Sequence, residues 1–253
     1  MTNPWFPITC VVVYLVAIFA GQRIMAHQEP YVMKKTLAAW NLSLAIFSLF
    51  GFLRGVPPLM HNFTTYGFEE FLCNDPQNSI GQSATAVWGI FFVLSKPAEL
   101  FDTFFIVMHK KRLLLLHWYH HVTVLLCCWH TYVSHAPAGL IYSTINYGVH
   151  AIMYFYYFLM AIKCKPKWFN PKWITLAQIT QMVVGSLVSI LSFHAIQKPG
   201  CWAKFENNTS ILIMYISYFF LFVQFFLKRY GWSIKTSVVE TKKSAKAKKK
   251  KLM

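Results

Sequence analysis

Seven apolar stretches, each about as long as a bilayer is thick, divide this chain of 253 residues. A helix that crosses the hydrocarbon core of a membrane needs about 20 mostly apolar residues. Charged residues make up only 13% of the sequence, against about 25% in ordinary soluble domains. We therefore expect an all-α integral membrane protein with seven transmembrane helices, over Trp5–Met25, Thr36–Val56, Ala84–Met108, Leu113–Val133, Ala138–Ile162, Trp173–Ile196 and Ser210–Tyr230.

The net charge of +16 is distributed unevenly between the loops. An odd number of spans places most of the 24 Lys and Arg residues on one side, in the loops 27–35, 109–112 and 163–172 and in the tail 231–253. Basic loops remain in the cytosol, so this asymmetry predicts a lumenal N-terminus and a cytosolic C-terminus. It also indicates a membrane protein with no nucleic-acid partner.

The opposite side receives acidic and sequon-bearing loops. The loop Leu59–Ser83 carries three acids and no Lys or Arg, and sequons begin at Asn62, Asn207 and Asn208. Glycosylation sequons belong to surface loops of secreted or lumenal segments. Each sequon alone is compatible with chance, but their joint placement agrees with the orientation that the charges predict.

Two regions follow from this organisation, a membrane domain over 1–230 and a Lys-rich cytosolic tail over 231–253. The tail ends in Lys250-Lys251-Leu252-Met253, which has the form of a dilysine retrieval signal of endoplasmic-reticulum membrane proteins. Such a signal is read by a receptor and is not an anchor. The alternative is a solvated basic tail that matches by coincidence.

Two of the six cysteines, Cys73 and Cys201, fall in loops of the predicted lumenal side. Disulfides persist in that compartment, so we predict that these two pair and tie the second–third loop to the sixth–seventh loop. The alternative is two free thiols in separate loops.

The fourth apolar stretch carries four histidines, of which His117, His120 and His121 lie close together in sequence and His130 lies further along. Spacings of three and four residues place the first three on one face of a helix. Ionisable side chains inside a membrane usually mark a functional path. The alternative is a purely structural role, in which the imidazoles are packed inside the bundle, hydrogen-bonded and inert.

The third stretch carries Lys96, Glu99 and Asp102 at intervals of three residues. Unpaired buried charge is costly, so one ammonium is expected to meet both acids along one helix face. Such a network either locks the helix against its neighbours or orients an imidazole, and the two roles are compatible.

Two further spans carry polar residues at helical spacing. Asn146, His150 and Tyr154 share a face of the fifth stretch, and Gln178 lies within a polar seam of the sixth. The seam is as consistent with interhelical hydrogen bonding as with a substrate contact. Polar faces inside a membrane point inward, which predicts a polar, histidine-containing interior.

The cytosolic mouth of that interior is expected to attract an anionic ligand, because cations surround it. The aromatic and aliphatic remainder of the interior would suit an acyl chain. The predicted CoA-binding or substrate-binding cations are Lys110, Arg112, Lys163, Lys165 and Lys167.

Four short motifs together resemble the ELO family, the fatty acid elongases of the endoplasmic reticulum. The motifs are Lys96-x-x-Glu99-x-x-Asp102-Thr103, His117-x-x-His120-His121, His150-x-x-Met153-Tyr154 and Thr175-x-x-Gln178. One such motif is a weak signal, whereas four in order across four spans are a strong one. The segment Leu116–Leu126 resembles most the branch that acts on saturated and monounsaturated chains.

The resemblance implies that spans two to seven enclose a narrow acyl tunnel, closed at the lumenal end. It implies condensation of a long-chain acyl-CoA with malonyl-CoA to a 3-oxoacyl-CoA, with release of carbon dioxide and CoA. No metal or redox cofactor is expected. A ketoacyl reductase, a dehydratase and an enoyl reductase of the same membrane are implied partners, and a homo-oligomer is one option for the quaternary state.

The resemblance also implies roles for the polar residues. His120 would take the acyl group as an acyl-imidazole, since an imidazole can act as a nucleophile. His150 would orient malonyl-CoA or stabilise the enolate oxygen. His117 and His121 would position groups and supply protons, and Asp102 or Glu99 would fix tautomers. Lys96, Asn146, Tyr154 and Gln178 are expected to support these groups.

Two other classes of protein compete with this interpretation. A histidine-box membrane desaturase or hydroxylase needs about eight histidines in three clusters to hold two irons, whereas this chain has one cluster and the isolated His150. A seven-span transporter could use the histidines as a proton relay. Transporters often contain internal repeats, and the two halves of this sequence have no convincing repeat.

Overall fold

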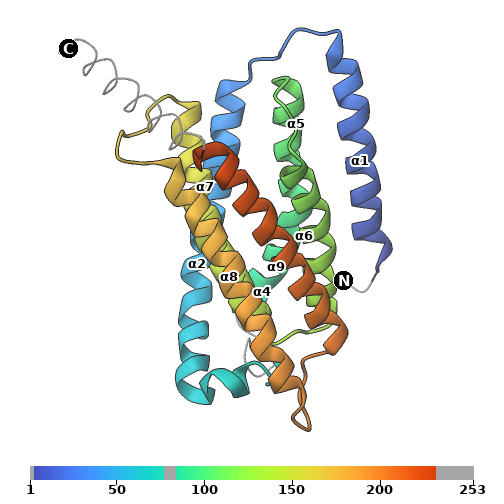
Figure 1. Cartoon of the computed structure of the whole chain (residues 1–253), viewed down its shortest axis with the longest axis vertical. Helices are drawn as coiled ribbons and strands as arrows, with labels where there is room; N and C mark the ends of the chain where they lie inside the picture. Colours follow the sequence, from blue (N-terminus) through green and yellow to red (C-terminus); the bar gives the residue numbers. More distant parts are fainter. Residues whose placement is uncertain (1–2, 77–83, 232–253) are drawn as a thin grey trace, which may run out of the picture.

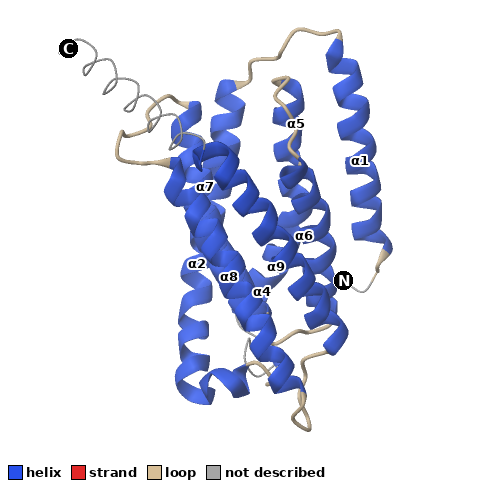
Figure 2. Cartoon of the chain, in the orientation of Figure 1, coloured by secondary structure: helices blue, strands red, loops and turns tan. Residues whose placement is uncertain are grey.

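The computed structural model describes residues 3–76 and 84–231 as an elongated bundle of antiparallel helices (Figure 1). Within these ranges every regular element is helical (Figure 2). The predicted tail and its dilysine signal lie, from residue 232 onward, outside the described residues. The elements are α1 (Trp5–Ala26), α2 (Lys34–Phe71), α4 (Ala84–Glu99), α5 (Phe101–Met108), α6 (Leu115–Val133), α7 (Gly139–Ala161), α8 (Pro171–Ile196), α9 (Phe205–Phe226) and a π-helix, η1 (Leu227–Gly231).

Four helical segments of the described chain are long and apolar enough to cross a membrane by length and composition. They are α1, α2, α8 and the continuous run of α9 and η1. The helices α6 and α7 have 19 and 23 residues, but histidine, asparagine and threonine side chains make them less apolar. Together these features indicate a multi-pass integral membrane protein.

The third predicted span is divided into α4 and α5 at Leu100. The amide of Leu100 donates to the Pro97 carbonyl at 3.3 Å, and the amide of Thr103 donates to the Leu100 carbonyl at 3.2 Å. These are bonds to the third residue back, which tighten the turn relative to an α-helix. Pro97 has no amide hydrogen, so the regular hydrogen-bond ladder is already interrupted one turn earlier.

The second helix is longer than the sequence predicted, because it continues through Pro57 and Pro58 to Phe71. Proline usually ends a helix, but membrane helices tolerate it when neighbouring groups satisfy the freed carbonyls. The direction of the chain changes only at Gly67, whose φ of 74° is left-handed and favours glycine. Figure 1 shows the last part of α2 turning at the lower end of the bundle.

Small residues bring α2 and α7 into close contact. A Cβ atom added to Gly51 would lie 2.6 Å from the ring of Tyr147, and one added to Gly55 would meet the Thr144 hydroxyl. Gly148 of α7 packs in the same way on the ring of Phe52. Glycine at these positions therefore sets how closely the two helices approach.

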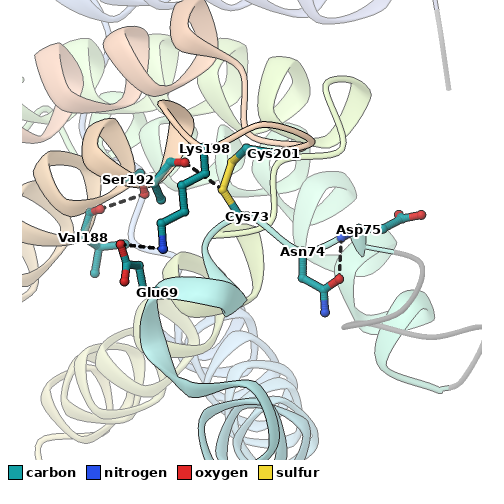
Figure 3. The surroundings of a disulfide bond; sticks show 9 residues. Glu69, Cys73, Asn74, Asp75, Val188, Ser192, Lys198 and Cys201 are labelled. Carbon is teal, nitrogen blue, oxygen red and sulfur yellow. Dashed lines mark hydrogen bonds and ion pairs between the residues drawn. A yellow bond between two sulfur atoms is a disulfide. The ribbon is translucent and has the colours of Figure 1, made fainter.

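A disulfide joins Cys73, after α2, to Cys201, in the loop between α8 and α9, with 4.6 Å between the Cα atoms (Figure 3). This is the pairing that the sequence predicted. The amide of Trp202 donates to the Cys73 carbonyl at 3.0 Å, and an exposed ion pair of 2.9 Å joins Lys198 to Glu69 nearby. The lower end of the bundle in Figure 1 is therefore cross-linked.

The sequons are not free surface loops in this fold. Asn62 is buried within α2, and Asn207 and Asn208 are buried in the first turn of α9. The Asn208 amide donates to the Ser189 carbonyl at 2.8 Å, and the Thr131 hydroxyl donates to the Asn207 amide oxygen at 3.2 Å. The predicted orientation consequently depends on charge distribution and the disulfide, not on the sequons.

Candidate active site

An apolar cavity of about 270 Å³ lies among α2, α4, α6, α7, α8 and α9. Its wall includes His120, in the second turn of α6, and His135, just after α6 ends, together with Pro76, Thr85 and Asn146. Along α6 the wall extends from His120 to Tyr132, which is about 18 Å at 1.5 Å per residue. Most of the remaining lining is aliphatic and aromatic. The cavity is therefore mostly apolar and extends along much of α6.

The three clustered histidines of α6, His117, His120 and His121, lie together, as the spacing predicted. The rings of His117 and His121 have centroids 4.5 Å apart, and those of His120 and His121 are 5.5 Å apart. Nε2 of His117 is hydrogen-bonded to the Thr103 hydroxyl at 2.8 Å. Among the three, it is His120 that reaches the cavity wall.

Tyr218 of α9 holds the segment of α6 that carries His120. Its hydroxyl donates to the His120 carbonyl at 3.1 Å and shares a hydrogen bond of 2.6 Å with the hydroxyl of Thr123. The ring centroids of Tyr218 and His120 are 5.0 Å apart. Because Tyr218 is only 1% exposed, these contacts fix both the backbone and the ring position of His120.

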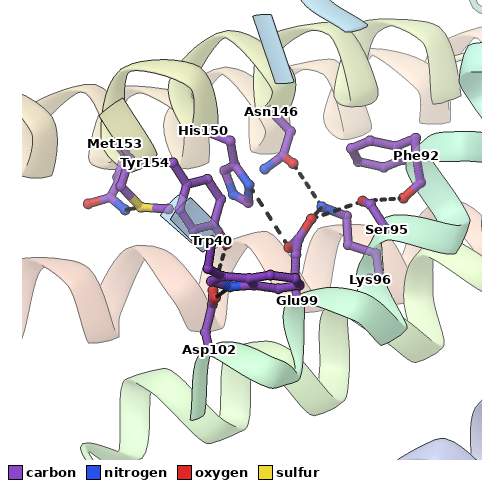
Figure 4. A network of polar contacts seen from close by, with 11 residues as sticks. Trp40, Phe92, Ser95, Lys96, Glu99, Asp102, Asn146, His150, Met153 and Tyr154 are labelled. Carbon is purple, nitrogen blue, oxygen red and sulfur yellow. Dashed lines mark hydrogen bonds and ion pairs between the residues drawn. The ribbon is translucent and has the colours of Figure 1, made fainter. Parts of the chain in front are cut away.

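A buried ion pair lies on α4, facing α7 (Figure 4). The Lys96 ammonium donates to Glu99 Oε1 at 2.7 Å and to the Asn146 amide oxygen at 3.2 Å. The Ser95 hydroxyl donates to the same Glu99 oxygen at 2.9 Å. Glu99 Oε2 lies 3.9 Å from Nδ1 of His150. The pairing of Lys96 with Glu99 is the one expected from their spacing.

The amide of Asn146 has a defined orientation because lysine is only a donor. Asn146 must present its oxygen to Lys96, so its NH₂ group points away from the ion pair. Asn146 belongs to the cavity wall. A hydrogen-bond donor therefore belongs to the same cavity wall as His120.

Asp102 binds groups other than the ones that the sequence suggested. Its Oδ1 accepts from the indole of Trp40 at 2.6 Å, and its Oδ2 accepts from the Tyr154 hydroxyl at 2.7 Å (Figure 4). The Tyr154 ring in turn packs on His150, with centroids 5.5 Å apart. Asp102 thus acts on His150 through Tyr154, whereas Glu99 faces the imidazole itself.

The remaining predicted residues are more dispersed. The Gln178 amide lies 3.3 Å from the Met153 sulfur. The Lys110 ammonium donates to the carbonyls of Ala26 and Gln28 at 3.2 and 3.0 Å, and thereby caps the end of α1. Lys165 donates to the Phe169 carbonyl at 3.3 Å. Three other predicted cations are exposed, namely Arg112, Lys163 and Lys167.

Across residues 3–76 and 84–231, no three His, Cys, Asp or Glu side chains form a group that could hold a metal ion. The di-iron alternative requires several such groups. The geometry of the described helices therefore gives it no support.

Three residues of the site escaped the sequence analysis, namely Tyr14, Trp40 and Tyr218. Tyr14 is the one tyrosine within the apolar stretch Trp5–Met25, and a polar group in the middle of a span was a usable signal. Trp40 and Tyr218 lie in aromatic-rich segments. Nothing in the sequence distinguishes them from ordinary core residues.

The chain resembles known proteins over most of its length. A family model described as ELO: GNS1/SUR4 family matches residues 1–245. A Gallus gallus protein named very long chain fatty acid elongase 6 is 41% identical over 217 residues, or 86% of this chain and 81% of the relative. The Homo sapiens protein of that name is 39% identical over 228 residues, or 90% and 85%. A Homo sapiens protein named very long chain fatty acid elongase 3 is 39% identical over 225 residues, or 89% and 82%.

Proposed function

We propose that this chain, which belongs to the ELO (GNS1/SUR4) family and is an enzyme of fatty acid elongation, condenses a long-chain acyl-CoA with malonyl-CoA. The products are a 3-oxoacyl-CoA two carbons longer, carbon dioxide and free CoA. The observation that carries the proposal is the position of His120 at the wall of an apolar cavity with the dimensions of an acyl chain.

In the first half-reaction, an imidazole nitrogen of His120 attacks the thioester carbonyl. The carbon–sulfur bond breaks and the proton on the other nitrogen of His120 passes to the sulfur, so that CoA leaves as the thiol and the acyl group remains on His120 as an acyl-imidazole. The acyl chain lies in the cavity among aliphatic and aromatic side chains. Tyr218 keeps His120 in place during this transfer through the hydrogen bond to its carbonyl.

In the second half-reaction, malonyl-CoA loses carbon dioxide and its C2 attacks the acyl carbonyl. The carbon–nitrogen bond to His120 breaks, a proton taken up from solvent restores the neutral imidazole, and the 3-oxoacyl-CoA leaves. Negative charge develops on carbonyl oxygens in both halves, where a fixed donor is most effective. The NH₂ group of Asn146 supplies such a donor, and His150, oriented by Glu99 and Tyr154, binds the malonyl-CoA enolate.

The same proposal includes the membrane topology. The helices α4 and α5 together form one span, so that the chain crosses the membrane seven times, and spans two to seven surround the acyl tunnel. The N-terminus is lumenal and the C-terminus is cytosolic, in the endoplasmic reticulum. Exposed cations such as Arg112, Lys163 and Lys167 bind CoA phosphates. The chemistry needs no metal or redox cofactor, and the reductases and dehydratase of the cycle act on the product.

Trapping of the acyl-enzyme tests the proposal. Purified protein is incubated with a long-chain acyl-CoA alone, and the adduct is located by mass spectrometry. Acylation of His120 is expected, with loss of adduct and of condensation in His120→Gln. His130, exposed on the same helix, provides the control variant His130→Gln. Acyl transfer to a cysteine, or no adduct at all, would overturn the role of His120.

The competing classes give different outcomes in the same preparation. Release of carbon dioxide from malonyl-CoA that depends on acyl-CoA is the signature of condensation. Movement of substrate across proteoliposomes without that release would indicate a transporter. Stoichiometric iron with oxygen-dependent desaturation would indicate the metal-dependent class.

A further inference from the structure

The first helix contributes a polar group to the histidine cluster. Tyr14 is 5% exposed, whereas Val12, Val13 and Val16 of the same helix are exposed. The Tyr14 hydroxyl lies 2.8 Å from the hydroxyl of Thr103 on α5. Its ring also packs on His121, with centroids 6.3 Å apart. The buried face of α1 therefore contacts both α5, through Thr103, and α6, through His121.

Thr103 connects this tyrosine to the histidines. Its side chain is fully buried, and its hydroxyl is shared between Tyr14 at 2.8 Å and Nε2 of His117 at 2.8 Å. A hydroxyl has one proton to donate and two lone pairs that accept. Tyr14, Thr103 and His117 thus form a chain of two hydrogen bonds through three different helices.

The number of available protons decides which group donates and which accepts in these two hydrogen bonds. If Nε2 of His117 carried the proton, three donors would compete for two hydrogen bonds, so the hydroxyl proton of either Tyr14 or Thr103 would be left without an acceptor in the chain. A buried donor without an acceptor is costly. In the opposite direction Tyr14 donates to Thr103 and Thr103 donates to Nε2, so both hydroxyl protons are used.

We propose that Tyr14 and Thr103 are positioning residues that hold His117 as the neutral tautomer with its proton on Nδ1. The inference rests on the proposed condensation at His120. With Nε2 occupied by Thr103, His117 cannot use that nitrogen to attack a thioester, and its ring stays fixed 4.5 Å from His121. The histidine cluster is thereby differentiated, so that His120 alone presents a nucleophile to the cavity.

If Tyr14 and Thr103 served only to hold α1 in the bundle, their replacement would lower the stability of the protein, whereas a positioning role would affect catalysis. Apolar contacts already attach α1 to the bundle, including the ring contact of Phe6 with Trp129 at 5.1 Å and the packing of Gly21 on Val107. Replacement of both partners of a buried hydrogen bond by apolar groups of similar shape is nearly neutral for stability. The double variant Tyr14→Phe/Thr103→Val leaves only Nε2 of His117 without a partner, whereas Thr103→Val also leaves the Tyr14 hydroxyl unpaired. The double variant should therefore have a melting temperature no lower than that of Thr103→Val.

The experiment measures kcat and KM for condensation, together with thermal stability, in detergent-purified full-length protein. Thr103→Val is expected to lower kcat about tenfold or more, within the range of acid–base contributions, with KM for both substrates within about twofold of wild type. Thr103→Ser keeps the hydroxyl and should restore most of kcat. Tyr14→Phe should lower kcat, and the double variant should lose no more than Thr103→Val, since both changes break one chain.

Controls separate failure of this inference from failure of the proposed function. Thr209→Val removes a hydroxyl that bonds only to its own helix in the described contacts, with the Phe205 carbonyl, and should retain wild-type kcat. Wild-type protein that forms no 3-oxoacyl product would refute the condensation itself. A wild-type protein that condenses, with Thr103→Val and Tyr14→Phe at the same kcat, would refute the positioning chain alone.

Discussion

Lys96 and Glu99 are both nearly inaccessible, with 2% and 4% of their surface exposed. Each compensates the charge of the other, and Ser95 and Asn146 supply additional hydrogen bonds. Removal of one partner from a buried pair leaves a charge that water cannot solvate. Each of the two residues can therefore be buried as an ion only while the other is present. The orientation of His150 depends on this pair because Glu99 faces its Nδ1.

Lys96→Met is expected to destabilise the protein by about 3–5 kcal/mol, because the Glu99 carboxylate remains buried without its cation. The double variant Lys96→Met/Glu99→Met should recover much of that loss, although condensation should not return. Thermal unfolding monitored by size-exclusion chromatography measures both. Lys198→Met is the matched control, since exposed pairs such as Lys198–Glu69 contribute little. Equal melting temperatures for Lys96→Met and Lys198→Met would contradict the prediction.

Tyr218→Phe should lower turnover several-fold and stability by about 1 kcal/mol, the usual contribution of one buried hydrogen bond. The change removes the donor to the His120 carbonyl and leaves the ring in place. Tyr119→Phe is the control, because its hydroxyl joins the same two helices through Ser217 at 3.1 Å. If the two variants have equal kcat, Tyr218 serves only to pack the helices.

Helical periodicity predicted some of these contacts and not others. Lys96 and Glu99 lie on one uninterrupted helix, so their spacing led directly to the observed pair. Asp102 follows the break at Leu100, so the step of three residues no longer places it on the same face. Its partners, Trp40 and Tyr154, come from helices far away in sequence, and single-sequence periodicity contains no information about such contacts.

Among the elements, α2 and α7 pack closely against each other beside the cavity. Gly51 and Gly55 belong both to the helix contact and to the cavity wall, as do Thr144 and Tyr147. A change in the separation of these helices therefore alters the cavity as well. The sequence contained this information as two small residues four positions apart, a spacing that favours close approach of membrane helices.

Gly51→Ala should destabilise the protein by about 1–3 kcal/mol, as overpacking usually does. The new methyl would lie 2.6 Å from the Tyr147 ring, so the helices must separate or the ring must move. Gly89→Ala on α4 is the control, because a Cβ there meets nothing within 4 Å, and alanine favours the helix more than glycine does. A lower melting temperature for Gly89→Ala than for Gly51→Ala would contradict this account.

At the scale of the elements, the sequence predicted the position of each helix better than its ends. The expected stop at Pro57-Pro58 is wrong, because α2 continues to Gly67 before it turns. The expected single span over 84–108 is two helices, because Pro97 disrupts the ladder just before the break. Local rules for proline describe the loss of one hydrogen bond, whereas the packing around it decides whether the helix continues.

For the whole molecule, the disulfide closes a loop of 128 residues in sequence separation. Long loops lose the most entropy of the unfolded chain on cross-linking, and removal of a native bridge typically costs about 2–5 kcal/mol. Cys73→Ser/Cys201→Ser should therefore melt at a lower temperature than wild type, and reductant should shift only the wild type. Cys164→Ser, an exposed free thiol, should leave both measurements unchanged. A reductant-insensitive wild type would contradict the assignment.

The buried sequons lead to a second prediction about the whole chain. Asn207 and Asn208 are 2% and 6% exposed and hydrogen-bonded across helices, so a glycan on either would prevent the observed packing. Protein from a eukaryotic host should show no electrophoretic shift on treatment with an N-glycosidase. A shift that Asn207→Gln or Asn208→Gln abolishes would mean that the first turn of α9 is not helical in the mature protein.

The bridge between Cys73 and Cys201 also makes the two ends of the bundle mechanically unequal. One end is closed by a covalent bond, whereas the other is held by noncovalent contacts such as the hydrogen bond from Lys110 to the Ala26 carbonyl at the end of α1. Any rocking of α8 and α9 against α2 must pivot near the cross-link, and its amplitude must increase with distance from it. We therefore expect the motion of α8 and α9 to be larger at the end of the bundle that carries Lys110 than at the end that carries the disulfide.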